Sequence, residues 1–122
     1  MVPLVRRAST IFDVGSISQA AALAALSDRA HLERVVTETL SEKDRVLSTL
    51  AKTDVRVFPA FGNFVSLWFP ERERATELES RLAAKAVFVK ALPAREVEGL
   101  VRVSVGRPED NDRFLDVLAR IS

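Results

Sequence analysis

The sequence contains no cysteine and a single histidine, His31, among its 122 residues. Without cysteine the chain has no disulfide bond, no thiolate nucleophile and no cysteine metal ligand. One imidazole also makes a Ser-His-Asp triad or a histidine-rich metal site difficult to build. His31 falls in the first turn of a predicted helix, and we expect it to lie on the surface. No metal site is therefore predicted in this chain.

Glycine and long apolar runs are also scarce. The four glycines lie far apart, at positions 15, 62, 99 and 106, so they form no glycine-rich phosphate loop. The net charge is only +1 with bases and acids interleaved, which favours neither a nucleic-acid nor a polybasic membrane partner. No apolar run approaches the roughly 20 residues that span a bilayer. No apolar stretch follows Arg6 and Arg7, as a secretory signal would require. We expect a cytoplasmic protein.

The remaining composition is that of a single globular domain. Hydrophobic residues make up 48% of the chain and charged residues 29%, which argues against disorder. Residues 1–15 show no hydrophobic period and contain Pro3 and Gly15, so we interpret them as an N-terminal arm or a severed linker. Residues 16–122 are then the folded domain.

Four helices are predicted from alanine content and from apolar residues at three- and four-residue steps. They cover residues 18–26 with a serine cap at Ser16 or Ser18, about 30–52 with a cap at Asp28, 70–84, and 108 to the end. Pro108 and the two acids after it suit a helix start. The apolar stripes expected to face the core are Leu32, Val36, Leu40, Leu47 and Leu50; Ala75, Leu78 and Leu82; and Phe114, Leu118 and Ile121.

Four strands are predicted at residues 55–58, 63–69, 87–90 and 100–105, where short β-branched or aromatic runs lie between turn signals. In the third strand, Val87 and Val89 face one way, and Phe88 and Lys90 the other. After residue 54 the order is β, β, α, β, β, α. This order predicts an α/β protein, more narrowly an α+β two-layer sandwich, with a small, mostly antiparallel sheet and helices on one face.

Arg102 is a cation in the middle of a valine-rich strand. Val101, Val103 and Val105 share one face of that strand, and Arg102 lies on the other. It is either an exposed cation on a solvated face or a bidentate grip for a carboxylate. Lys90, on the polar side of a neighbouring strand, is a second cation for the same anion. The other lysines, Lys43, Lys52 and Lys85, sit among charges on predicted helices, and we expect them to be exposed and not to form a Schiff base.

Four stretches in the right order resemble the histidinol-phosphate aminotransferases and their close relatives, which are fold-type I enzymes dependent on pyridoxal phosphate. Residues 100–111, LVRVSVGRPEDN, resemble the C-terminal motif of that family. Gly62-Asn63-Phe64-Val65 is similar to its Asn-aromatic strand, and residues 17–26 to the helix after its catalytic segment. Residues 85–90 match a place where the family usually has a glycine and a strand that ends in arginine; this chain has Ala86 and Lys90 there.

The resemblance implies that this chain is the small C-terminal domain of such an enzyme, either a truncated product or a natural fragment. The Schiff-base lysine, the aspartate on the pyridinium nitrogen and most phosphate contacts would lie in a large upstream domain, so no catalytic or cofactor-binding residue is expected here. Arg102 would bind the substrate α-carboxylate, Lys90 the distal end of the substrate, and Asn63 would support the site. Lys90 and Ala86 leave open whether the substrate is histidinol phosphate, an aromatic amino acid or another phosphorylated amino acid.

Two classes of function follow. In the first, the parent enzyme is a homodimer that transfers an amino group between an amino acid and a 2-oxo acid, and the chain alone has no transaminase activity. In the second, the chain is a free-standing amino-acid-binding or assembly module; a degenerate remnant is a third alternative. If the large domain is absent, Phe12, Phe88 and the alanine-rich helix are the candidates for an uncovered apolar surface that favours self-association.

Overall fold

The computed structural model of the chain describes residues 14–58, 61–92 and 98–121. Phe12 and most of the predicted arm at 1–15 lie outside the described residues, as does the side chain of Ile121. The chain divides into two compact units, residues 1–35 and residues 36–122, and the division falls inside one helix. Of the helices in the described ranges, none combines the length and apolar character that a bilayer-spanning helix needs.

The first unit contains α2 (Ser16–Ser27) and the beginning of α3 (Arg29–Leu50). No residue of α2 is buried. Gly15, not a serine, is the N-cap of α2, and it makes no side-chain cap. The predicted cap of the long helix is confirmed, because Asp28 Oδ1 accepts a hydrogen bond from the backbone N–H of His31 at 3.0 Å. His31 itself is exposed, as predicted.

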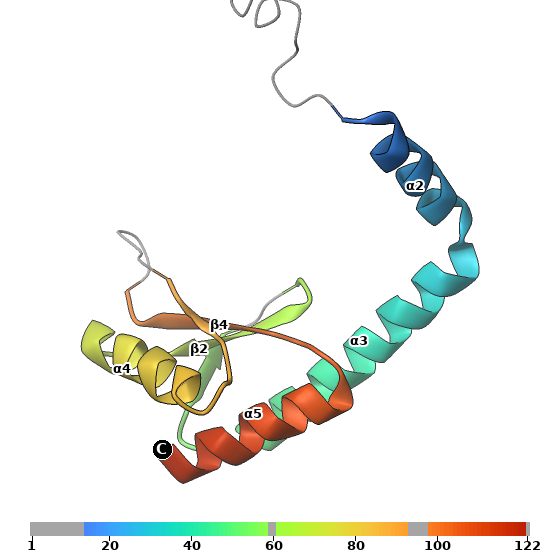
Figure 1. Ribbon diagram of the computed structural model, residues 1–122. Coiled ribbons are helices and arrows are strands. Elements are labelled where there is room, and N and C mark those ends of the chain that lie inside the picture. The colour runs from blue at the N-terminus through green and yellow to red at the C-terminus, as the bar shows by residue number, and fades with distance from the viewer. Residues whose placement is uncertain (1–13, 59–60, 93–97, 122) are drawn as a thin grey trace, which may run out of the picture. The chain divides into compact units, whose positions relative to one another are not determined.

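The second unit is built on a four-stranded antiparallel sheet (Figure 1). Its strands are β1 (Arg56–Phe58), β2 (Phe64–Trp68), β3 (Lys90–Ala91) and β4 (Leu100–Ser104). They lie in the order β1-β2-β4-β3, and every neighbouring pair is antiparallel. The predicted small antiparallel sheet is therefore confirmed, with β4 between β2 and β3.

Helices cover one face of this sheet. The C-terminal half of α3, together with α4 (Arg72–Ala83) and α5 (Pro108–Ile121), packs against the inward strand residues, and Figure 1 shows α4 and α5 on the covered side. The buried core takes one stripe from each helix and alternate residues from the strands: Val46, Leu50, Val65, Leu67, Ala75, Leu78, Leu82, Ala91, Val101, Val103, Phe114 and Leu118. The two-layer α+β architecture is confirmed.

The predicted strand at 87–90 is mostly wrong, because only Lys90 pairs with β4, together with Ala91. The chain leaves α4 through Ala86, whose φ of 56° is in the left-handed region that favours glycine. Alanine there costs about 1 kcal/mol, which explains why glycine suits this place. The predicted facing survives: Val87 and Val89 pack partly against the core, whereas Phe88 is 82% exposed.

The apolar stripe predicted along α3 is buried over only half of its length. Leu32, Val36 and Leu40 are exposed, whereas Leu47 is partly buried and Leu50 fully buried. Within the second unit, the sheet and helices cover the C-terminal turns of α3 but leave Val36 and Leu40 exposed. The periodic pattern correctly predicts the helix, but it cannot show which part of the helix the core reaches.

Gly99 fixes the register between β2 and β4. Its φ is 79°, and a Cβ at this position would lie 1.9 Å from the carbonyl oxygen of Phe69. The Phe69 N–H donates to the Gly99 carbonyl oxygen at 2.9 Å. Only glycine allows this approach, and the register that follows places Val101 and Val103 inside and Arg102 outside.

Asn111 joins the end of β4 to α3. Its side chain is buried; Nδ2 donates to Glu42 Oε2 at 2.9 Å and to the Gly106 carbonyl at 3.0 Å, and Oδ1 accepts from the Gly106 N–H at 2.9 Å. Arg45 donates to Glu42 and, at 2.6 Å, to Asp112 Oδ1. Hydrogen bonds from Arg45 and then Asn111 lower the pKa of Glu42. This network fixes the turn between β4 and α5 against α3.

Candidate functional site on the open face of the sheet

The face of the sheet opposite the core carries the predicted site residues Arg102 and Lys90. Residues at directly opposed positions of an antiparallel sheet share a face. Arg102 is opposed by Ser66 on β2 and by Lys90 on β3, so the three form one row across the sheet. Arg102 and Lys90 are exposed, whereas their strand neighbours Val101 and Ala91 are buried in the core. The sheet therefore brings the two predicted cations together.

An aromatic ring supports Arg102. The Cζ atom of Arg102 lies 5.8 Å from the centroid of the Phe64 ring on β2, within the range of a cation–π contact. Among the described residues, Arg102 is in no ion pair. A guanidinium that lies over a ring keeps its N–H groups, which lie in its plane, available for an anion. The contact orients Arg102 without neutralising its charge.

Lys90 and Arg102 form a like-charge pair. Directly opposed residues have Cβ atoms about 4.5–5.5 Å apart, and like charges there destabilise the sheet. Lys90 Nζ is 3.3 Å from Glu79 Oε1 on α4, and this ion pair offsets part of the repulsion. An anion bound between the cations would offset it further. Part of the charge of Lys90 is therefore already balanced, whereas Arg102 is in no ion pair among the described residues.

Asn63 does not lie in the same row. It precedes β2, and its carbonyl oxygen accepts the N–H of Val105 at 2.8 Å. The residue opposite Arg102 on β2 is Ser66, three positions further along. Asn63 is exposed at the end of the sheet. The structure thus places Asn63 beside the end of β4 rather than beside Arg102.

The lysines do not form a cofactor site. Lys43 is buried, which contradicts the predicted exposure, because it shares a helix face with Val46 and Leu50. Its stem packs with them while Nζ donates to the Gly62 carbonyl at 3.0 Å. Lys52 and Lys85 are exposed, and Lys90 is paired with Glu79. The described residues hold no lysine in an apolar pocket of the kind that covalent attachment of pyridoxal phosphate needs, so this chain alone does not fit that cofactor.

Sequence reasoning missed three partners of the predicted cations. Ser66 and Phe64 belong to the predicted strand 63–69, and their alternation with Val65 and Leu67 is a sequence signal that puts them on one face. What the alternation could not give is the register that sets Ser66 opposite Arg102. Glu79 carries no local signal, because its contact with Lys90 depends on how α4 packs along the sheet edge.

Comparison with known proteins decides the family. Residues 2–118 match the family described as "Aminotransferase class I and II". The chain belongs to this family. Among curated relatives, the chain is 37% identical over 118 residues to histidinol-phosphate aminotransferase 1 of Mesorhizobium japonicum, covering 97% of this chain and 32% of the relative. It is 37% identical over 115 residues to histidinol-phosphate aminotransferase 3 of Rhizobium meliloti, covering 94% and 30%. The chain thus spans about a third of the length of these aminotransferases.

A solved aminotransferase has the same fold. The histidinol-phosphate aminotransferase of Sinorhizobium meliloti, solved in complex with pyridoxal-5'-phosphate, superposes with a TM-score of 0.77 at 21% identity, over 87% of this chain and 30% of that one. At this identity the likeness concerns the fold. The predicted resemblance to the small domain of fold-type I aminotransferases is confirmed, while the roles of Arg102, Lys90 and Asn63 stay predictions.

Proposed function

We propose that this aminotransferase domain supplies the arginine that holds the substrate α-carboxylate, and that Arg102 is that arginine. The observation that carries the proposal is the row of Ser66, Arg102 and Lys90 on the one sheet face that the helices of the second unit leave open. The enzyme that contains this domain then exchanges an amino group between an amino acid and a 2-oxo acid. Bound pyridoxal phosphate, held by a large domain, supplies the electron sink for this chemistry.

The contribution of Arg102 is orientation. A guanidinium binds a carboxylate through two parallel hydrogen bonds, which fix the direction of the substrate as well as its position. Phe64 holds the guanidinium from below, so the fork is pre-organised before substrate arrives. Fixing the carboxylate fixes the bond from Cα that must break, and such positioning supplies a large share of enzymatic rate enhancement.

Lys90 fits the distal end of the substrate. It is the register partner of Arg102 and extends the positive row toward the edge strand β3. A compact ammonium suits a phosphate or carboxylate without demanding bidentate geometry. The proposed substrates are therefore amino acids with a second polar group, such as a phosphorylated amino acid, or an aromatic amino acid whose ring meets Phe64. Asn63 is proposed as a supporting group at the end of the sheet.

The decisive experiment uses Arg102→Gln in the enzyme formed by this chain and its large domain. Truncating one partner of a desolvated charge pair costs about 2–5 kcal/mol, so kcat/KM for the amino acid should fall by about 30-fold or more. Arg107→Gln is the matched control, because Arg107 is an exposed arginine whose partners are Glu109 and Asp110. It should retain the efficiency of the wild type. Equal efficiency of the two variants would remove the argument for Arg102.

The chain by itself is proposed to be inactive. No described lysine is placed for covalent attachment, since Lys43 donates to a backbone carbonyl and Lys90 is paired. Incubation with pyridoxal phosphate followed by borohydride should leave no stoichiometric adduct on a single lysine, and no transamination should be measurable. A specific adduct that forms at one lysine would contradict this part of the proposal.

Self-association is proposed for the chain, and a homodimer for the enzyme. Support comes from exposed large apolar side chains on α2 and the N-terminal half of α3: Ile17, Leu23, Leu26, Leu32, Val36 and Leu40. Exposed apolar surface favours association. Sedimentation velocity at increasing concentration should show dimers or larger species, and a strict monomer would contradict this. The proposed compartment is the cytoplasm, which cell fractionation tests.

A further inference from the structure

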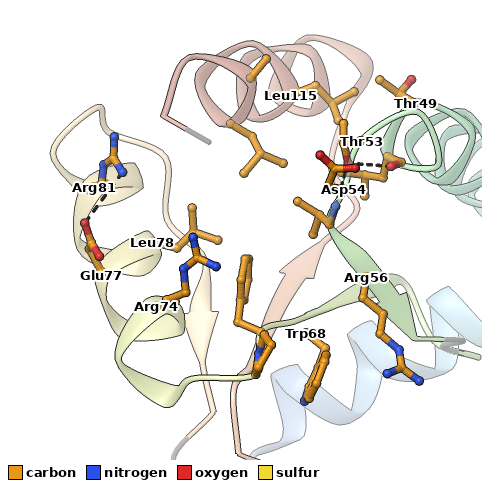
Figure 2. A pocket seen from close by; sticks show the side chains of 16 residues that line it. Thr49, Thr53, Asp54, Arg56, Trp68, Arg74, Glu77, Leu78, Arg81 and Leu115 are labelled. Carbon is orange, nitrogen blue, oxygen red and sulfur yellow. Dashed lines mark hydrogen bonds and ion pairs between the residues drawn. The ribbon is translucent and has the colours of Figure 1, made fainter.

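A groove lies on the helix-covered side of the second unit, away from Arg102. Its volume is about 910 Å³, within the range of ligand pockets. The walls come from the end of α3, from α4 and α5, and from the adjoining ends of β1 and β2 (Figure 2). Neither Arg102 nor Lys90 lines it. The groove is therefore separate from the site proposed above.

Apolar side chains make up the floor of the groove. Leu50, Leu78 and Leu118 are core residues that reach it from three different helices, and Phe69 and Leu115 are partly buried beside them. Pro70 adds a further apolar surface. Burying apolar surface of a ligand against such a floor is favourable by about 25 cal/mol per Å². The floor therefore suits a ligand with an apolar body.

Arg74 provides the cation of the groove. Figure 2 shows its side chain extending from α4 toward the hollow, while Arg81 and Glu77 pair with each other on the same helix at 3.8 Å. The only ion pair of Arg74 among the described residues is a long contact of 4.0 Å with Glu71, and both side chains are largely exposed. Such a pair contributes little. The Arg74 guanidinium is thus available for a ligand anion.

Asp54 gives the groove a direction. It lies on the opposite wall, beside Thr53 in the segment that precedes β1 (Figure 2), and is in no ion pair among the described residues. A carboxylate would be repelled at this end and attracted at the α4 end. Arg56 also lines the groove, but its side chain extends away from the hollow in Figure 2 and lies over the Phe58 and Trp68 rings at 5.1 and 5.0 Å. The groove therefore suits one negative charge at Arg74.

We propose that this groove binds a small monocarboxylate with an apolar body, the carboxylate at Arg74 and the body on the floor formed by Leu50, Leu78 and Leu118. The arrangement combines an apolar floor, the weakly engaged Arg74 extending toward the hollow, and Asp54 at the far end. This is a second ligand site of the chain, with its own arginine.

The tryptophan of the chain makes the proposal measurable. Trp68 is the single tryptophan, the sequence contains no tyrosine, and Trp68 lines the groove. Its fluorescence should change saturably when 4-phenylbutyrate is added to the chain. The primary amide of the same compound should bind about tenfold more weakly, because it lacks the charge that Arg74 recognises. A response without saturation, or equal affinity for acid and amide, would overturn the proposal.

Matched variants on one helix locate the binding. Arg74→Gln should weaken 4-phenylbutyrate binding about tenfold, whereas Arg72→Gln, at an exposed arginine of α4 outside the groove, should leave it unchanged. Ala119→Phe, which places a ring in the groove from α5, should also abolish the response. Wild-type affinity in Arg74→Gln would overturn the proposal.

Arg102→Gln separates the two sites. The fluorescence response to 4-phenylbutyrate should persist in this variant, even though the carboxylate grip proposed for the open face is removed. Loss of the response in Arg102→Gln would assign the binding to the open face and overturn the groove proposal. Conversely, an unchanged kcat/KM in Arg102→Gln would count against the proposed function but would not affect the groove measurement.

Discussion

The two faces of the sheet differ in burial and polarity, although their residues alternate along the same strands. On the covered face, Leu67 and Val101 are completely buried. On the open face, Ser66 and Arg102 occupy the neighbouring positions, and Arg102 is exposed. One face therefore holds the fold together, and the other presents polar groups whose placement the fold fixes. Residues of the covered face should control stability, and those of the open face should control binding.

The largest effect should come from breaking the covered face. Leu67→Ala leaves a cavity at a site with no exposure and should lower the free energy of unfolding by about 3 kcal/mol. Ser66→Ala, at the adjacent position on the open face, is the matched control and should change it by less than about 0.5 kcal/mol. Urea unfolding measures both. A similar loss in the two variants would show that the faces are not energetically distinct.

A smaller effect should follow when the register that separates the faces is disturbed. Gly99→Ala forces a Cβ against the Phe69 carbonyl and an alanine into a positive φ, and should cost roughly 2 kcal/mol. Gly15→Ala is the control, since a Cβ at that position meets nothing within 4 Å. Thermal unfolding should separate the two variants, and equal stability would contradict the role assigned to Gly99.

Acid should weaken the corner where β4 meets α5. The folded-state pKa of Glu42 is lowered from 4.5 by hydrogen bonds from Arg45 and then Asn111. Glu42 therefore contributes stability that is fully present above about pH 4.5 and is lost as the pH falls through the folded-state pKa. Glu42→Gln should flatten the pH dependence of unfolding in this window, and Asn111→Ala should weaken it. An unchanged profile in Glu42→Gln would refute this linkage.

The smallest effect on stability should come from the open face. Arg102→Gln removes one member of the like-charge pair with Lys90 and one cation–π contact. These changes oppose each other, so the free energy of unfolding should change by less than about 0.5 kcal/mol. A loss of several kcal/mol would make Arg102 a structural residue and undermine its role in binding.

Local patterns in the sequence predict the elements and the facing of side chains better than the pairing of strands. Alternation correctly places Val101 and Val103 inside and Arg102 outside, and alanine content together with apolar spacing predicts each helix of the described residues. The strand predicted at 87–90 fails because its pairing with β4 begins only at Lys90 and continues to Ala91. Lys43 is buried because its aliphatic stem lies on the apolar face of α3. Its charge nevertheless makes the sequence predict an exposed residue.

For the candidate site, the sequence predicts the two cations but not the residues that contact them. Alternation predicts that Arg102 and Lys90 lie on the polar sides of their strands, and the register brings them together. Glu79 and the row with Ser66 depend on packing between elements distant in sequence. Asn63 was grouped with them by resemblance, and the structure places it at the end of the sheet.

The central claim is that Arg102 recognises the charge of the substrate carboxylate. Its most direct test is the inhibition constant of an unreactive carboxylate analogue and of its primary amide, measured in the wild-type and Arg102→Gln forms of the enzyme with its large domain. The wild type should prefer the carboxylate by about tenfold or more, and Arg102→Gln should lose that preference. A preference of the same size in both forms would contradict the claim.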